Sequence, residues 1–352
     1  RLDSSMIVKT FDSGWEQKGS VLAYPTGWQR PAKTEEWAYE QCIRDLPENR
    51  HVQMLSFPWA TLIDVLRRRP KGAYPYLKAL DLCPPRKTLV RATVCQHIYA
   101  KDLLQYFKHL GITDLFWSHA QNKETKIDGI RIHPFPLYPV RCFDSTRLEC
   151  DRAKPLIERK YLCSFIGAYD SNLYLSPVRK WILDLPPRAD VYAAMRSEWH
   201  YEKEVYGEQI QGISESDEQK AVKAHHANEY VAVLQETIFS LCPSGSGPNS
   251  IRLWESFGFG CIPVMLSDSF LTPVKSELWD KAVITVKETQ DTVSDIISCL
   301  ERVAKNPNQI SQMSAAGREI WSSFIKNASV SYIAETMIKS LKMPLKMHQI
   351  NT

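Results

Sequence analysis

At 352 residues, the chain is too long for a single ordinary core and suits two domains of common size. Apolar residues make up 44% and charged residues 24%, a globular composition that excludes a disordered protein. The net charge is only +4, and Lys and Arg are scattered, so the sequence gives no indication of a nucleic-acid partner.

Cysteine usage and hydropathy bear on the compartment. No run of about 18 apolar residues occurs, so the sequence predicts no transmembrane segment. The nine cysteines form no paired CxxC motifs, which argues against a structural zinc site, and several lie in apolar runs as core residues. These features favour a reducing compartment. The expected location is the cytoplasm, with or without a peripheral association of the protein with a membrane. If an anchor precedes Arg1, the expected location is the Golgi lumen. The pattern leaves the oligomeric state open.

In the N-terminal half, short apolar segments alternate with helical patterns. The expected strands are 20–24, 51–57, 89–95, 115–118 and 130–132. Helices are expected over 34–42, with Thr34 as N-cap, and over 101–110, with Gly111 as the stop signal. Three prolines between His133 and Pro139 then break regular structure and mark the start of an interdomain linker.

The C-terminal half repeats this alternation. The expected strands are 160–167, 190–194, 238–243, 261–266 and 282–286, and the expected helices are 228–236, 249–259, 292–305 and 310–324. The polar segment 208–224 is expected to be a surface loop or a frayed helix. Such alternation predicts an α/β fold with parallel sheets covered on both faces. We expect a domain over residues 1–150, a second over 151–335, and a C-terminal tail or helix over 336–352.

The segment from Phe239 to Leu266 is the most informative part of the chain. It reads as a buried strand, a loop rich in Gly, Ser and Pro that contains Gly247, a helix that starts near Asn249 and Ser250, and another buried strand. Ligands bind parallel sheets at the carboxyl ends of the strands, where such loops lie. A helix N-terminus favours a diphosphate. The sequence therefore predicts a phosphate site in this loop.

Two charged side chains on that helix fit the same ligand. Arg252 lies in the first turn and can bind phosphate, and Glu255, one turn later, can accept hydrogen bonds from ribose hydroxyls. The alternative from pattern alone is that Arg252 and Glu255 form a solvated salt bridge and that the glycines only make a turn.

Three segments in this order resemble the exostosin-like glycosyltransferases. Residues 239–245 are similar to the family's F-C-L-x-P-x-G segment, 250–255 to its S-x-R-x-x-E helix, and 260–264 to its G-C-x-P-V strand. Upstream, the segment from Arg159 to Gly167, followed by Arg179, is similar to the family's R-x-x-L-x-x-F-x-G…R segment. Tyr230 also falls where the family has a tyrosine. The matches cover about residues 158–268.

The resemblance implies a GT-B fold of two Rossmann-like domains, with sheets that face each other across a cleft. It implies an inverting glycosyltransferase that needs no metal and moves a sugar from a nucleotide donor, mostly UDP-sugars, to a glycan acceptor. No cofactor other than this donor substrate is expected. The donor-binding residues that it implies are Gly167, Arg179, Ser250, Arg252 and Glu255, beside the Gly247 and Asn249 of the loop.

The acceptor side resembles the family only loosely. The segment from Gly111 to Ala120 departs from the family's G-x-D-H-x-x…H-D pattern at Leu115 and Ala120. Inversion requires a general base, and an imidazole titrates near neutrality, so we expect His119 as the base. Asp114 and then His97 are the alternatives.

Two other classes of function remain to be distinguished. A non-catalytic subunit that binds nucleotide sugar or glycan would share the scaffold, but it would not require the complete set of Ser250, Arg252 and Glu255. A dehydrogenase is disfavoured because no GxGxxG lies between a strand and a helix. The sequence does not identify the donor sugar, the acceptor or the linkage.

Overall fold

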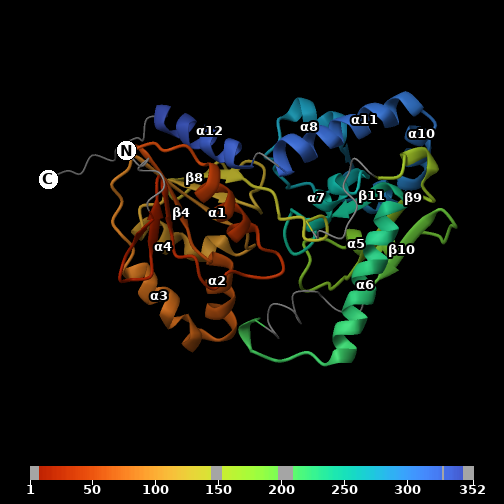
Figure 1. The fold of residues 1–352 in the computed structure, drawn as a ribbon. Coiled ribbons are helices and arrows are strands. Elements are labelled where there is room, and N and C mark those ends of the chain that lie inside the picture. Colours follow the sequence, from red (N-terminus) through yellow and green to blue (C-terminus); the bar gives the residue numbers. More distant parts are fainter. Residues whose placement is uncertain (1–7, 144–152, 197–208, 327–328, 344–352) are drawn as a thin grey trace.

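The computed structural model describes residues 8–143, 153–196, 209–326 and 329–343. Each half of the chain builds one mostly parallel sheet with helices on both faces (Figure 1). The expected α/β fold of two Rossmann-like domains, the GT-B architecture, is confirmed. Among the described residues, no helix is long and apolar enough to span a bilayer.

The first sheet has the strand order β1-β2-β3-β4-β5-β6-β8-β7. Its central strands β3, β4, β5, β6 and β8 are parallel and were all expected. The edge strands β1, β2 and β7 are antiparallel to their neighbours and only two or three residues long, too short for a sequence pattern. The strands are β1 Lys9–Thr10, β2 Glu16–Lys18, β3 Val21–Ala23, β4 Val52–Ser56, β5 Val90–Cys95, β6 Asp114–Trp117, β7 Lys126–Ile127 and β8 Ile130–Pro134.

Both faces of this sheet are buried, because successive side chains of a strand point in opposite directions. Met54 and Phe116 pack in one core cluster, whereas their neighbours Leu55 and Leu115 pack in another. The helices of the first half are α1 Thr34–Asp45, α2 Trp59–Arg68, α3 Tyr74–Asp81 and α4 Leu104–His109. Helix α1 covers the face of Met54, and α2, α3 and α4 cover the face of Leu55.

The second sheet has the order β10-β9-β11-β12-β13 and is parallel throughout. Its strands are β9 Tyr161–Gly167, β10 Val191–Met195, β11 Thr237–Pro243, β12 Ile262–Leu266 and β13 Ile284–Thr285. Its helices are α5 Val178–Leu183, α6 Asp217–Gln235, α7 Ile251–Gly258, α8 Ser276–Ala282, α9 Gln290–Ser294, α10 Ile296–Ala304 and α11 Pro307–Glu319. A π-helical turn, Ile320–Lys326, follows α11, and α12 Ser329–Lys342 ends the described chain.

Two details of the helices differ from expectation. Helix α6 begins at Asp217, within the segment expected to be a surface loop or a frayed helix, and it is regular there because Ser216 and Gln219 form a reciprocal capping box. Thr34 is not an N-cap: Lys33 holds that position, and the Thr34 hydroxyl accepts a hydrogen bond from the backbone N–H of Tyr138 in the linker (2.9 Å).

The domain division stays a prediction. The boundary expected at residues 150/151 lies outside the described residues. The boundary expected at 335/336 falls inside α12. This helix follows the second domain in sequence but packs against α1 and β5 of the first, beside the N-terminal half in Figure 1.

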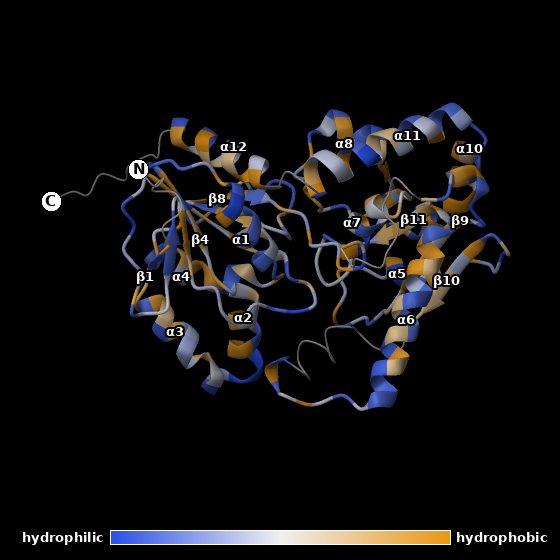
Figure 2. Ribbon diagram, viewed as in Figure 1, coloured by the Kyte–Doolittle hydropathy of each residue, from blue (hydrophilic) through white to orange (hydrophobic). Residues whose placement is uncertain are grey.

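One hydrophobic cluster joins the two halves. It contains Val52 and Phe116 of the first sheet together with Trp254 of α7 and Met265 of β12, all of them buried. Figure 2 shows hydrophobic residues concentrated along the inner strands and on the inward sides of the helices. The orientation of the two sheets is therefore set by a shared core.

Candidate functional site

A cavity of about 710 Å³ lies between the two sheets, a size typical of small-molecule sites. Residues one or two positions after the ends of four parallel strands line it: Gln96 after β5, His119 after β6, Ala168 after β9 and Gly245 after β11. The carboxyl ends of both sheets thus meet at one place, as expected for a ligand site of parallel sheets.

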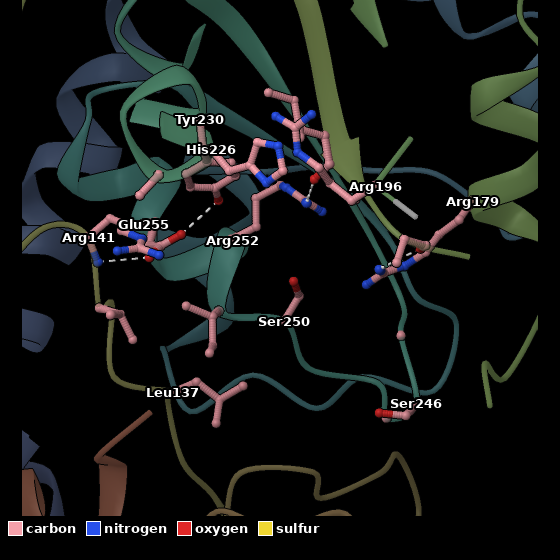
Figure 3. Close-up of a pocket in the computed structure, with 18 of the residues that line it drawn as sticks. Leu137, Arg141, Arg179, Arg196, His226, Tyr230, Ser246, Ser250, Arg252 and Glu255 are labelled. Atoms are coloured by element: carbon pink, nitrogen blue, oxygen red, sulfur yellow. Dashed lines mark hydrogen bonds between the residues drawn. The ribbon is translucent and has the colours of Figure 1, made fainter. Parts of the chain in front are cut away.

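Helix α7 brings the predicted donor residues to this cavity. Ser250 is its N-cap residue, but the hydroxyl makes no capping hydrogen bond. Ser250, Arg252 and Glu255 all line the cavity (Figure 3). The N-terminal turn thus offers a hydroxyl and a cation beside the positive end of the helix dipole.

The Arg252 guanidinium is buried, with 9% of the residue exposed, and is only partly satisfied. Nη2 donates to the Ile166 backbone carbonyl, while the buried Nε and Nη1 have no hydrogen-bond partner. A buried charged donor without a partner is costly. These two nitrogens are therefore suited to an anionic ligand.

Arg179 lines the same cavity, and its guanidinium, like that of Arg252, lies near the Phe165 ring. Its Nε donates to Ser244 O (2.9 Å) and its Nη1 to Ala168 O (3.1 Å), which fixes the guanidinium at the cavity wall. Burial, and then the neighbouring Arg252, lower the pKa of Arg179 to about 10, which leaves it charged at neutral pH. Two cations therefore share one cavity, and a bound anion would relieve their repulsion.

Two glycines make room for these arginines. A Cβ on Gly167 would lie 2.8 Å from the Phe165 ring and 3.2 Å from Arg252 Nη2. A Cβ on Gly245 would lie 2.9 Å from Arg179 Nη2. Gly167 lines the cavity as expected, and its lack of a side chain lets the guanidinium approach the strand end.

Glu255 is held by hydrogen bonds and not by Arg252. Its carboxylate accepts from the Tyr230 hydroxyl (2.7 Å) and from the backbone N–H of Arg141 (2.9 Å). Within the described residues, Arg252 and Glu255 form no ion pair, so the solvated salt bridge is not observed. Each carboxylate oxygen keeps a further lone pair for a ligand hydroxyl.

For Asn249, contact with the donor stays a prediction, and its side chain has another role in the structure. It lies at the cavity, but its amide is fully engaged between the two halves of the chain. Nδ2 donates to Ser118 O (2.8 Å) and Phe135 O (3.3 Å), while Oδ1 accepts from Ser250 N and Trp254 Nε1. Four partners exhaust the capacity of an amide.

Gly247 also lies where the two halves meet. A Cβ there would lie 2.3 Å from His119 Nδ1 and 2.8 Å from Ile98 Cγ2, so only glycine fits without displacing the first-domain wall. This close contact explains why the residue is a glycine. Gly247 also lines the cavity, and its contact with the donor stays a prediction.

His119 lines the cavity, but it does not titrate near neutrality as expected. Burial, and then the nearby His97, lower its pKa to about 3. Its Nδ1 is buried without a partner, against Gly247. A neutral imidazole with so low a pKa, shielded in this way, is a poor general base.

The alternative bases are engaged elsewhere. Asp114 is fully buried, does not line the cavity and is not available as a base. Burial raises its pKa, but stronger hydrogen bonds lower it below its usual value overall, and their donors are His133, Arg131, Ser340 and Thr113. His97 lines the cavity, yet both ring nitrogens are occupied: Nε2 by Asp64 (2.9 Å) and Nδ1 by the Tyr99 N–H (3.0 Å).

Apart from Tyr230, which the resemblance indicated, sequence reasoning missed the side of the cavity formed by α6. The residues that line the cavity from this helix fall on one face: Glu218, Gln219, Val222, Lys223, His226, Ala227 and Tyr230. Their spacing of three and four residues is helical. The same spacing can be read in the sequence, but the segment is polar on all sides and has no apolar stripe that would indicate a buried face.

Comparison with known proteins identifies related sequences. The Exostosin GT47 domain model matches residues 111–303. Human exostosin-2 is 28% identical over 120 residues, which are 34% of this chain and 16% of that protein. A probable glucuronosyltransferase 47 A of Physcomitrium patens is 37% identical over 79 residues, 22% of this chain and 18% of that protein. The chain thus matches less than a quarter of the length of these curated relatives.

Solved structures show a more distant similarity. The HepE protein of Anabaena in complex with UDP aligns over 83% of this chain and 79% of its own, with 9% identity and a TM-score of 0.38. A glycosyltransferase from Rickettsia africae aligns over 88% and 80%, with 9% identity and a TM-score of 0.40.

Proposed function

The chain belongs to the exostosin GT47 family, whose domain model matches more than half of it, and from this premise we propose that it is an inverting glycosyltransferase. Its donor is a nucleotide sugar, of the UDP type, and its acceptor is a hydroxyl of a glycan. Curated relatives named as probable glucuronosyltransferase and probable beta-1,4-xylosyltransferase support a sugar-transfer activity.

One observation carries the proposal: the buried Nε and Nη1 of Arg252 have no partner in the described structure. Arg179, which lines the same cavity, adds a second positive charge. In sugar transfer the leaving diphosphate gains negative charge, and fixed cations stabilise that charge. Ser250 adds a hydroxyl at the helix N-terminus. This arrangement supports departure of the nucleotide without a metal ion.

The nucleoside would lie next to α7. Glu255, oriented by Tyr230, can accept hydrogen bonds from both ribose hydroxyls through its remaining lone pairs. Burial and then the adjacent Glu255 raise the pKa of Tyr230 well above its usual value, so it stays a hydrogen-bond donor. This fixes the carboxylate for recognition of a diol.

The acceptor hydroxyl must lose its proton as the new bond forms. Among the described residues that line the cavity, the carboxylates are Glu215, Glu218 and Glu255. Glu255 is engaged with Tyr230, and Glu215 lies 3.7 Å from Lys223. We therefore assign the role of base to Glu218, an exposed residue on the cavity side of α6.

A non-catalytic subunit that binds nucleotide sugar remains the alternative function. Ligand binding and turnover separate the two. UDP at 100 times its Kd should stabilise the protein by about 2.7 kcal/mol, whereas NAD should not shift Tm. A screen of UDP- and GDP-sugars for donor hydrolysis then identifies the sugar. Stabilisation by UDP without turnover of any donor would favour the binding subunit, and no stabilisation would contradict both.

A further inference from the structure

Asn249 joins three elements of the site. Its Nδ2 donates to two backbone carbonyls of the first domain, Ser118 O just after β6 (2.8 Å) and Phe135 O just after β8 (3.3 Å). Its Oδ1 accepts from two groups at α7, the Ser250 N–H (2.9 Å) and Trp254 Nε1–H (2.8 Å). Two carbonyls require the amino group on one side and two N–H donors require the oxygen on the other, so the amide has one orientation.

The elements that it joins have different tasks in the proposed function. Helix α7 carries Arg252 and Glu255, which hold the donor. The strand ends at Ser118 and Phe135 belong to the first domain, which faces the acceptor. The residue is buried, with 4% exposed, so these bonds are shielded from water. Asn249 is thus a direct polar link between the donor side and the acceptor side of the cavity.

A second contact confirms that the two sides meet tightly here. Gly247, two residues earlier, lies against His119 and Ile98 so closely that a Cβ would overlap both. A shift of α7 away from the strand ends would break the Asn249 bonds, and a shift towards them would force the Gly247 backbone into His119. The relative position of donor helix and acceptor wall is therefore bounded in both directions.

We propose that Asn249 is a positioning residue for sugar transfer, which sets the distance between the donor on α7 and the acceptor on the first domain. The inference rests on the proposed function. Bimolecular transfer requires the reacting atoms to lie about 3–3.5 Å apart and aligned, and a misplacement of about 1 Å can cost 10²-fold. Attack by water on the donor has no such requirement for the acceptor wall. Loss of the link should impair transfer to acceptor more than donor hydrolysis.

Tyr332 offers a matched control. Its hydroxyl, on α12, donates to Pro134 O (2.8 Å), the residue before Phe135 in the first domain. This bond also connects distant parts of the chain at the end of β8, but Tyr332 does not line the cavity. Tyr332→Phe removes one such bond away from the donor helix.

The test compares Asn249→Asp, Asn249→Ser and Tyr332→Phe with the parent in four measurements: Tm, UDP affinity by calorimetry, transfer kcat and donor hydrolysis. Asp keeps the shape but loses both N–H donors and places a carboxylate against two carbonyls. Ser keeps one donor and serves if the Asp variant does not fold. For Asn249 variants we expect UDP Kd within about threefold of the parent and transfer kcat reduced at least about tenfold. The ratio of hydrolysis to transfer should rise.

Three results would overturn the proposal. A loss of UDP affinity as large as the loss of kcat would make Asn249 a donor contact. An equal rise of the hydrolysis-to-transfer ratio in Tyr332→Phe would reduce the effect to general stability. Unchanged transfer in the Asn249 variants would remove the role altogether. Failure of the parent protein to bind UDP is a separate outcome, because it would refute the proposed function itself.

Discussion

Arg252 is the residue on which the proposed donor site depends most. Its two unpartnered nitrogens are expected to bind the diphosphate, whose charge increases as the sugar leaves. Arg252→Ala should therefore lower kcat/KM by about 10²-fold or more, with a smaller loss of UDP affinity. The exposed Arg188, which pairs with Asp190 and Glu301, is the matched control and should tolerate alanine. Parental kinetics in Arg252→Ala would contradict the site.

Glu218 is tested in the same assay against Glu215, a second carboxylate on the same side of the cavity. Glu218→Gln should reduce transfer kcat by about 10²-fold, the usual contribution of a general base, with UDP affinity unchanged. Glu215→Gln should keep most of the activity. A Glu218→Gln enzyme with more than about a tenth of parental kcat would exclude this residue as the base.

We expect His119 to affect the pH dependence of the free energy of unfolding more than it affects catalysis. Its folded pKa of about 3 lies below the ordinary 6.5, so between these values the unfolded chain binds a proton that the folded chain does not. The free energy of unfolding should therefore fall as pH decreases from about 6.5, by at most about 1.4 kcal/mol per pH unit from this residue. In urea titrations from pH 7 to 4, the parent should lose more stability than His119→Gln. Parallel curves would show that His119 is not buried as described.

At the scale of elements, α6 and the segment before it complete the cavity. Residues 209–216 lead from the first half, where Ile210 is 4% exposed in a core cluster that contains Leu55 and Trp59, to α6 on the second sheet. The Arg30 backbone N–H also donates to Gln209 Oε1 (3.0 Å). The polar N-terminal part of α6, which lines the cavity, is thereby tied to the first half of the chain.

Ile210→Ala should weaken this docking. Replacing a buried isoleucine with alanine costs about 2–5 kcal/mol. The rest of this short segment is mostly exposed, so its other contacts offset little of that loss. We expect faster proteolysis within residues 209–216 and a higher KM for the donor, with Tm less affected because the two sheets keep their shared core. Ile213, 59% exposed in the same segment, is the control. Equal proteolysis of both variants would refute the anchoring role.

At the scale of the whole molecule, the charges in the cavity lead to an expectation about metals. Arg179, Arg252 and the α7 N-terminus supply positive charge where the diphosphate is expected. We predict that the unmodified protein transfers sugar at the same rate with and without excess EDTA. A loss of turnover that Mg²⁺ or Mn²⁺ restores would contradict this prediction and would require metal-binding groups beside the phosphates.

The sequence by itself determined the fold class, the order of the parallel strands along the chain and the position of helix α7. These features are local: buried strands are short apolar runs, and the motif around Arg252 lies within one strand-loop-helix unit. Gly167 and Arg179 could be assigned to the same site because the resemblance supplied their relation to Arg252, although they lie more than 70 residues away.

Only the tertiary structure decided what each polar side chain binds. Asn249 and Asp114 each face partners that are distant in sequence, and burial, which no local pattern reports, lowers the pKa of His119. The same holds for α12, which returns from the second domain to cover the first sheet. Hydrogen-bond partners and desolvation depend on contacts between the two halves of the chain, and these contacts exist only in the folded protein.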